Sequence, residues 1–363
     1  MGTGDHEPMM LQRHPRRLAT TLALTVLVFT SSACTEATPT TTSKPEQTAA
    51  TTPAVDAAPQ PDGVAAVFAE PTFEVVVTED VVYAQGLSHD TWGSDAVETM
   101  DLLLDVYEPV RSDDAVMPAI VMIHGGGFTG GSKSTRWISQ WAPWFAERGW
   151  VVYSIDYRVA EDHGTLPADY PELPADLTRK QVDQALAVYP ACRDAKAAIR
   201  WVNATADEYS VSTDHIAVIG GSAGSVLAVT LGASNPNDCT DEISAREDPT
   251  LSTTNLDQPS DVATVIDHWG GTAILNVLEM MDGVDRFDPS DAPISIVHGT
   301  EDPTVLFSEA EAIRAAYEST GVTYEWHPLE GKGHGPWEAT IDGQPLFESA
   351  ADFIIETQSL TVE

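Results

Sequence analysis

A serine stands at the centre of residues 220–224, Gly-Gly-Ser-Ala-Gly. An apolar run at residues 216–219 precedes it and an apolar run of helical spacing follows, which predicts a strand, a sharp turn and a helix. Such a turn holds the Ser222 hydroxyl clear of the sheet at a helix N-terminus, where the helix dipole favours developing negative charge. The pattern indicates that Ser222 is a nucleophile, and a glycine-rich turn without chemistry is the alternative.

A hydroxyl nucleophile needs a general base, and the base needs an acid that orients it. After Ser222, an apolar strand pattern ends in His-Gly-Thr-Glu-Asp-Pro, and a later glycine-rich loop carries His334. We interpret His334 as the base, because a histidine in a glycine-rich loop has little reason to be structural. Asp302 is the preferred acid, with its neighbour Glu301 as the alternative. His298, at the strand end, is expected to be a packed turn residue.

Three successive glycines at residues 125–127 follow His124, directly after an apolar run at residues 119–123. Glycines let a chain aim its amide groups at one point of a cleft, which is what a developing oxyanion requires. A nucleotide-phosphate loop is the rival interpretation, and it fails because no Lys-Ser/Thr follows the glycines. The chain has no HExxH motif and no His and Cys residues at ligand spacings, so we expect neither a metal nor another cofactor.

The elements that must position these residues alternate between strand and helix patterns. Strands are expected at residues 73–83, 100–107, 119–123, 150–155, 216–219, 262–266, 294–297 and 322–327. Helices are expected at residues 134–148, 193–202, 309–317 and 346–355, and another opens at Ser222. This alternation predicts an α/β protein with a mostly parallel sheet of about eight strands and helices on both faces. The acidic, Pro-rich residues 158–189 predict an excursion over the mouth of the site.

The front of the chain, residues 1–34, has the pattern of an export signal. Three arginines at residues 13–17 precede an apolar run that is too short to span a bilayer comfortably. Cys34 then follows three small residues, which resembles a bacterial lipoprotein signal with Cys34 as the lipid acceptor. Cleavage after Ala33 and free secretion is the alternative. We therefore expect an exported protein, either extracellular or a lipoprotein of the cell envelope.

Residues 35–65 are rich in Thr, Pro and Ala and lack apolar periodicity, which predicts a flexible tether. We expect residues 66–363 to form one folded catalytic domain, which carries every candidate site residue except Cys34. Cys192 and Cys239 are a candidate disulfide, because an exported chain meets an oxidising compartment. Two unpaired small core residues are the alternative for this pair.

The charge balance limits the partners of this chain. Asp and Glu number 56 against 18 Lys and Arg, a formal net charge of -38. Such a surface repels phosphate backbones and anionic lipid, so we exclude nucleic acid and expect membrane contact only through a lipid on Cys34. On the same ground, anionic substrates are disfavoured and neutral substrates are not.

Six ordered segments resemble one known family. They lie at residues 124–128, 153–158, 193–202, 220–224, 298–305 and 331–337. Together they resemble the esterase/lipase group of α/β-hydrolases, which includes bacterial carboxylesterases, hormone-sensitive-lipase-like enzymes and acetyl or feruloyl esterases. The chain order serine, acid, histidine is that of the α/β-hydrolase fold. Two departures are Ser225, where many relatives carry a second glycine, and the lack of a cap-helix pattern in residues 35–62.

The resemblance implies a serine carboxylic-ester hydrolase that acts through an acyl-enzyme on neutral esters, small or polymeric. It assigns a triad and an oxyanion hole to these positions: Ser222, Asp302 and His334, with the amides of Gly126, Gly127 and Ala223. Phe128 and Trp269 are candidate substrate contacts, although packing is the alternative for Trp269. An amidase of the same fold, such as an arylformamidase, stays open as another function, as does a non-catalytic binding protein on a hydrolase scaffold.

Overall fold

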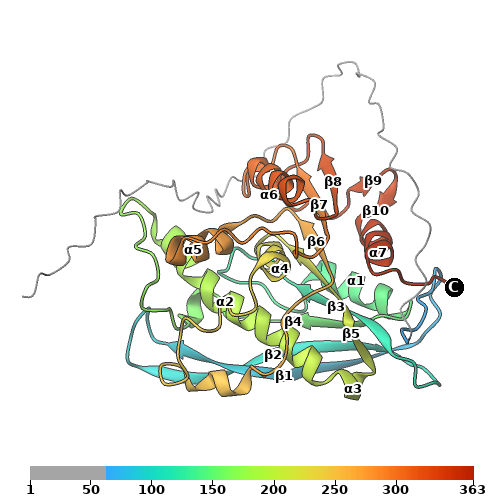
Figure 1. Ribbon diagram of the computed structural model, residues 1–363, viewed down its shortest axis with the longest axis horizontal. Coiled ribbons are helices and arrows are strands. Elements are labelled where there is room, and N and C mark those ends of the chain that lie inside the picture. The colour runs from blue at the N-terminus through green and yellow to red at the C-terminus, as the bar shows by residue number, and fades with distance from the viewer. Residues whose placement is uncertain (1–62) are drawn as a thin grey trace, which may run out of the picture.

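The computed structural model describes residues 63–363, whose core is one eight-stranded sheet in the order β1-β2-β4-β3-β5-β6-β7-β8 (Figure 1). The expected mostly parallel sheet of about eight strands, covered by helices on both faces, is confirmed. The predicted export signal, Cys34 and nearly all of the tether lie outside the described residues. Val64 pairs with Val116, so the folded domain includes residues slightly before the expected start at residue 66.

The strands differ in burial according to their place in the sheet. Their bounds are β1 Val75–His89, β2 Val97–Pro109, β3 Met117–Ile123, β4 Val151–Ile155, β5 Val211–Gly221, β6 Thr264–His268, β7 Ile294–Gly299 and β8 Tyr324–Leu329. β1 and β2 pair antiparallel, as do β2 and β4, and all pairs from β4 to β8 are parallel. The central β3 and β4 are buried along their whole lengths, as continuous apolar runs predict.

Helices cover both faces of the sheet (Figure 1). One face packs against α1 Arg136–Ala146 and α7 Leu346–Thr357. The other packs against α2 Arg179–Ala204, α4 Ala223–Ala233, α5 Ala273–Asp282 and α6 Phe307–Thr320. The smaller elements are α3 Ala206–Tyr209, the 3-10 turns Ala160–Asp162 and Pro249–Thr253, and a hairpin of β9 Thr340–Ile341 and β10 Gln344–Pro345. Within the described residues, no helix is both long and apolar enough to cross a membrane.

The largest departure from the expected elements is α2, which begins at Arg179 rather than at residue 193. A capping box starts it, in which the Thr178 hydroxyl accepts the Gln181 amide and the Gln181 side chain accepts the Thr178 amide. Pro190 lies inside this helix. Because an interior proline normally breaks a helix, the sequence pattern predicted only the part after it. The excursion after β4 is therefore shorter than expected.

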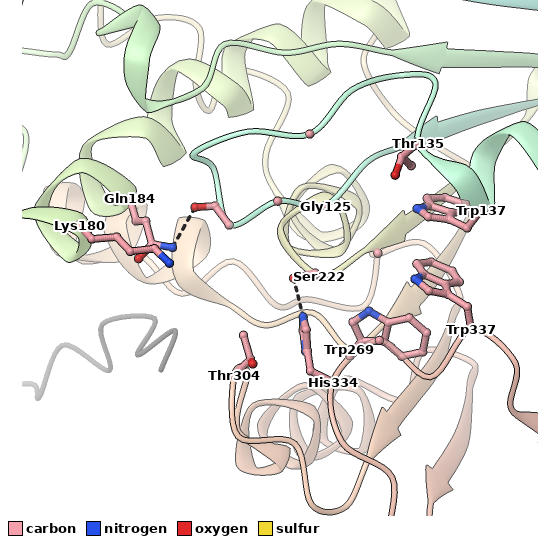
Figure 2. Close-up of a pocket in the computed structure, with 15 residues that line it drawn as sticks. Gly125, Thr135, Trp137, Lys180, Gln184, Ser222, Trp269, Thr304, His334 and Trp337 are labelled. Carbon is pink, nitrogen blue, oxygen red and sulfur yellow. Dashed lines mark hydrogen bonds between the residues drawn. The ribbon is translucent and has the colours of Figure 1, made fainter. Parts of the chain in front are cut away.

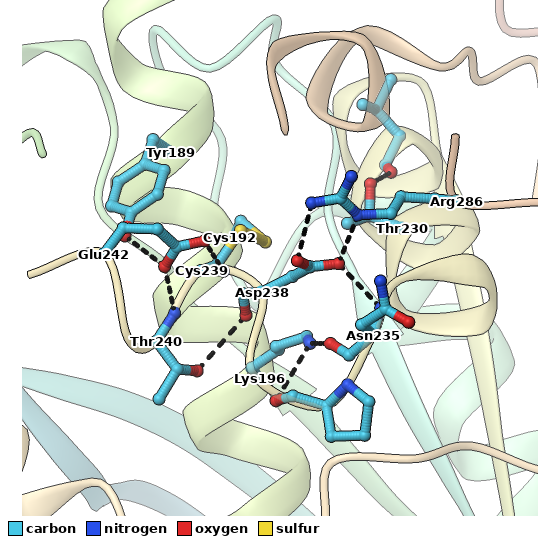
Figure 3. The surroundings of a disulfide bond; sticks show 12 residues. Tyr189, Cys192, Lys196, Thr230, Asn235, Asp238, Cys239, Thr240, Glu242 and Arg286 are labelled. Carbon is cyan, nitrogen blue, oxygen red and sulfur yellow. Dashed lines mark hydrogen bonds and ion pairs between the residues drawn. A yellow bond between two sulfur atoms is a disulfide. The ribbon is translucent and has the colours of Figure 1, made fainter. Parts of the chain in front are cut away.

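Cys192 and Cys239 form a disulfide with an S–S distance of 2.17 Å and a Cα–Cα distance of 5.9 Å (Figure 3). Cys192 lies on α2, and Cys239 lies in the segment after α4. The same segment is held by an ion pair between Asp238 and Arg286, whose Nε lies 2.8 Å from the carboxylate. The disulfide and this ion pair fix the loop after α4 to the body of the domain.

Replacing both cysteines with alanine should lower the free energy of unfolding by about 2–4 kcal/mol, because the bridge closes a long loop in the unfolded chain. The separation is 47 residues, for which the chain-entropy model gives about 4 kcal/mol. Guanidinium unfolding of the oxidised wild type and the Cys192→Ala/Cys239→Ala variant measures the difference. An unchanged midpoint would show that the bridge carries no stability.

Candidate active site

Ser222 lies in the turn between β5 and α4, with φ 56° and ψ −120°. A positive φ is strained for serine, and strain of this kind persists only where the surroundings impose it. Two glycines make the turn possible. A Cβ on Gly220 would lie 2.3 Å from the Gly224 oxygen, and one on Gly224 would lie 2.0 Å from the Ile123 oxygen. The tight crossing of β3, β5 and α4 thus presents the Ser222 hydroxyl to the cleft.

The structure brings Ser222, His334 and Asp302 into one hydrogen-bonded chain (Figure 2 shows its serine–histidine bond). His334 Nε2 lies 2.8 Å from Ser222 Oγ, and His334 Nδ1 lies 2.7 Å from Asp302 Oδ2. A carboxylate only accepts, so Nδ1 carries the proton and Nε2 is free to take the serine proton. The alternative acid, Glu301, is exposed, whereas the Asp302 side chain is fully buried.

Asp302 is held from several directions. Its Oδ1 accepts the amides of Thr304 and Val305 at 2.8 and 3.1 Å, and His298 Nε2 lies 3.4 Å from its Oδ2. Burial would raise the pKa of this carboxyl, but the hydrogen bonds from His298 and His334 outweigh burial and hold the pKa well below its ordinary value. The acid of the triad is therefore a carboxylate at any pH near neutrality.

A buried polar group lies behind Asp302. His298 Nε2 donates to the Val305 oxygen at 2.9 Å. Asp267 pairs with Ile296 across β6 and β7, so its side chain lies on the same face of the sheet as that of His298. Asp267 accepts a hydrogen bond from the Ser225 hydroxyl. The departure at Ser225 thus has a structural reason, because this serine satisfies a buried carboxyl.

His298 should act as a positioning residue for Asp302. A hydrogen bond to a charged group contributes about 1.5–3 kcal/mol, so His298→Leu should lower kcat roughly ten- to a hundredfold. KM should change little, because His298 has no contact with the cleft. His298→Gln places an amide donor near the position of Nε2 and should recover most of kcat. Steady-state kinetics of both variants tests this role, and equal kcat values for the two variants would refute it.

The loop after β3 supplies candidate oxyanion donors. Gly126 and Gly127 have φ values of 125° and 61°, which favour glycine, and a Cβ on Gly126 would lie 1.9 Å from the Gly130 oxygen. No acceptor within residues 63–363 takes the amides of Gly126, Gly127 or Ala223. Gly126 and Gly127 line the same cavity as Ser222, and Ala223 is the first residue of α4. Such amides suit an oxyanion formed beside Ser222.

Gln184 supports this loop, and the sequence did not reveal it. Its Nε2 donates to the Gly127 oxygen at 2.9 Å, from a side chain buried on α2. A second support is Tyr157, whose hydroxyl donates to the His124 oxygen at 2.9 Å. Both contacts engage carbonyl oxygens of the loop, so neither of them occupies an amide group that an oxyanion would need. The sequence does not identify Gln184, because its pattern predicts an irregular excursion and not a helix at residues 158–189.

A cavity of about 470 Å³ surrounds the Ser222 hydroxyl. Figure 2 shows Trp137, Trp269 and Trp337 on one side of it and Lys180 with Gln184 on the other. Its remaining lining residues are Gly125, Gly126, Gly127, Gly131, Thr135, Gly221, Thr304, His334 and Gly335. The space suits a small acyl group with its leaving group, and the tryptophans give it a largely apolar wall.

Two predicted contacts have different outcomes. Trp269 lines the cavity and packs edge-on against Trp337, with ring centroids 4.6 Å apart. Phe128 does not reach the cavity. Its side chain is 0% exposed and packs against Tyr157, so the expectation that it touches substrate is corrected. His268 is buried against Trp141 and Trp337, and burial lowers its pKa to about 3, which keeps this histidine neutral.

Within the described part of the chain, no three His, Cys, Asp or Glu side chains are grouped so that they could hold a metal ion. The residues around Ser222 instead offer a nucleophile, a base, an orienting acid and free amides. This set of groups can carry out acyl transfer with side chains and backbone alone.

The BD-FAE family model matches residues 104–175 and 181–285, which include the glycine loop and Ser222. A curated relative is Esterase LipC of Mycobacterium tuberculosis (strain ATCC 25618 / H37Rv), 29% identical over 130 residues. That match covers 36% of this chain and 26% of LipC, about a quarter of the relative's length.

Solved structures of esterases are similar over most of the chain. The propionate-bound esterase Est2 of Thermogutta terrifontis is 26% identical with a TM-score of 0.53, over 80% of this chain and 96% of that one. The same esterase phosphonylated by cyclosarin is 27% identical, over 80% and 96%, with a TM-score of 0.53. A truncated carbohydrate esterase from gut microbiota, 21% identical over 81% and 99% with a TM-score of 0.55, shares the fold.

Proposed function

We propose that this chain, which belongs to the esterase/lipase group of α/β-hydrolases, hydrolyses carboxylic esters through an acyl-enzyme on Ser222. The observation that carries the proposal is the continuous chain from Ser222 Oγ through His334 to Asp302, with bonds of 2.8 and 2.7 Å. The similar esterase 2 of Thermogutta terrifontis, which is phosphonylated by cyclosarin and phosphorylated by paraoxon, supports a serine-type mechanism. The free amides beside Ser222 supply the electrostatic part of catalysis.

Acylation begins when Ser222 Oγ attacks the ester carbonyl carbon and His334 Nε2 accepts the serine proton. The carbonyl oxygen becomes an oxyanion, which the amides of Gly126, Gly127 and Ala223 stabilise. Asp302 stabilises the imidazolium that forms on His334. The tetrahedral intermediate then collapses, the C–O bond to the alcohol breaks, and His334 gives its proton to the departing oxygen.

Deacylation repeats these steps with water as the nucleophile. His334 Nε2 takes a proton from water, and the resulting hydroxide attacks the acyl carbon. The same amides hold the second oxyanion. Ser222 leaves with the proton from His334, which restores the enzyme and releases the carboxylic acid.

An amidase of the same fold would use the same residues, so an ester hydrolase and an amidase are distinguished by the substrates they cleave. Phenyl acetate and acetanilide differ only in the scissile ester or amide bond and form a matched pair. We expect hydrolysis of the ester, with the amide no faster than in buffer. Faster cleavage of acetanilide than of phenyl acetate would favour an amidase. If the protein cleaves neither compound and none of a panel of longer esters, a binding protein would be favoured.

We also propose that the protein is exported and attached to the cell envelope through Cys34. Support comes from the basic and apolar pattern before Cys34 and from the Cys192–Cys239 disulfide, which suits an oxidising compartment. Metabolic labelling with an alkyne fatty acid should mark the wild-type protein and not a Cys34→Ser variant. Equal absence of label in both would indicate free secretion.

A further inference from the structure

The basic residues of this chain are few, and most of them have a partner. Of 18 Lys and Arg residues, four precede Gly63, which leaves 14 in the described part. Ten of these contact a carboxylate, a hydroxyl or a backbone oxygen through their side chains. Four make no side-chain hydrogen bond or ion pair with any described residue: Arg136, Lys180, Arg246 and Lys332.

Three of these four unpaired cations line the active-site cleft. Lys180 lines the cavity that holds Ser222, on the side opposite the tryptophans (Figure 2). Arg136 and Lys332 line a second cavity, of about 440 Å³. The two cavities share Thr135, Trp137, Gly335 and Trp337, so they adjoin each other, and together they are called the cleft below. Arg246 lines neither cavity.

Acidic residues show the opposite distribution. Of 56 Asp and Glu residues, six precede Gly63, which leaves 50 in the described part. Among the residues that line the two cavities, Glu338 is the one acid, whereas three lining residues are Lys or Arg. The excess of acid over base is thus reversed at the cleft. This reversal matters because ions near 0.15 M screen charges beyond about 8 Å, so nearby cations outweigh distant acids.

The missing partners are also informative. Acids outnumber bases about threefold in this chain, so a lysine or arginine on the surface would ordinarily meet a carboxylate. Arg136, Lys180 and Lys332 meet none, which leaves their charges available to a ligand in the cleft. A carboxylate is the ligand group that complements them.

We propose that the cleft takes esters that carry a carboxylate away from the scissile bond, in addition to neutral esters. The inference rests on the proposed ester hydrolysis at Ser222 and adds a substrate class to it. The net charge of the whole chain disfavours such substrates. A bound ester, however, lies closest to the side chains of the cleft, where cations outnumber acids. A carboxylate on one side of the scissile bond would meet Lys180, and one on the other side would meet Arg136 and Lys332.

Two pairs of substrates test the proposal, each pair differing by one charge. The mono-4-nitrophenyl ester of glutaric acid is compared with the 4-nitrophenyl ester of glutaramic acid, which places the charge on the acyl side. The acetate of 4-hydroxybenzoic acid is compared with that of 4-hydroxybenzamide, which places it on the alcohol side. The measured quantity is the ratio of kcat/KM for the charged ester to that for its neutral partner.

We expect Lys180→Met, Arg136→Gln and Lys332→Met to lower this ratio by about two- to fivefold for each cation that the carboxylate meets. Added salt should lower the wild-type ratio and leave the triple variant unaffected. Arg246→Gln is the matched control, since it removes a cation outside the cleft that likewise forms no ion pair, and it should leave both ratios unchanged.

The proposal would be overturned if none of the three cleft variants changed the ratio of kcat/KM values for either substrate pair. A decrease of the same size in Arg246→Gln would overturn it as well, because the effect would then come from net charge. Failure of the proposed function is a separate result, in which the wild type hydrolyses none of the four esters.

Discussion

Replacing Ser222 with alanine should lower kcat/KM for a short 4-nitrophenyl ester by roughly 10⁴- to 10⁶-fold. The variant keeps the amides and the cavity but lacks the atom that forms the acyl-enzyme. His334 then has no hydroxyl to deprotonate, although its Nε2 lies 2.8 Å from that hydroxyl in the wild type. Initial rates of 4-nitrophenol release from the two proteins measure the effect.

Ser139→Ala is a suitable control, because Ser139 is an exposed serine on α1 that bonds only to neighbouring backbone oxygens. Its activity should match that of the wild type. The Ser222→Ala protein should also unfold at a denaturant concentration close to that of the wild type. Retention of more than a few per cent of activity by a folded Ser222→Ala protein would remove Ser222 from the mechanism.

A second large effect is expected from a buried ion pair that has no part in the chemistry. The side chains of Arg158 and Asp194 are 3% and 2% exposed, and Arg158 Nη2 lies 2.7 Å from the Asp194 carboxylate. Asp194→Ala would leave the guanidinium buried with Leu87 O as its remaining hydrogen-bond acceptor. Loss of one member of such a pair costs about 3–5 kcal/mol, so Asp194→Ala should strongly destabilise the domain.

Guanidinium unfolding measures this loss, and the double variant Arg158→Met/Asp194→Leu is its control. The double variant removes both charges and should regain much of the stability, because no unpaired charge stays buried. A loss of less than about 1 kcal/mol in Asp194→Ala would mean that water or another group replaces the carboxylate.

This ion pair also joins two of the segments that carried the family resemblance. Arg158 ends the segment at residues 153–158, and Asp194 lies in the segment at residues 193–202. Both segments were informative about the fold, and neither contributes to the triad. Arg158 also approaches Gly86 so closely that a Cβ there would lie 2.7 Å from its Nε. The two segments are therefore joined by an ion pair between the loop after β4 and α2.

The residues of the triad could be selected from the sequence because each lies in a local pattern. Ser222 sits between an apolar strand and an apolar helix, and His334 and Asp302 each follow a strand pattern. Carboxyl ends of parallel strands meet at one edge of the sheet, so residues just beyond them come together. The local sequence patterns and this rule about the carboxyl ends of parallel strands were enough to group Ser222, Asp302 and His334.

The rest of the cleft could not be predicted, because it depends on contacts between distant segments. Trp137 and Trp337 are 200 residues apart and stack with ring centroids 4.4 Å apart. Gln184 reaches the Gly127 oxygen from a helix whose first half was hidden by Pro190. Phe128 is a candidate substrate contact in the sequence, but the chain turns there at φ 58° and the ring is buried in the core.

The most direct test of the account is to locate the nucleophile in the native protein. A fluorophosphonate ester should form a single covalent adduct, and peptide mass spectrometry should place it on Ser222. His334→Ala should slow the labelling strongly, and heat-denatured protein should not react. An adduct on another residue, or a native protein that hydrolyses esters without taking up the label, would contradict the mechanism proposed for this cleft.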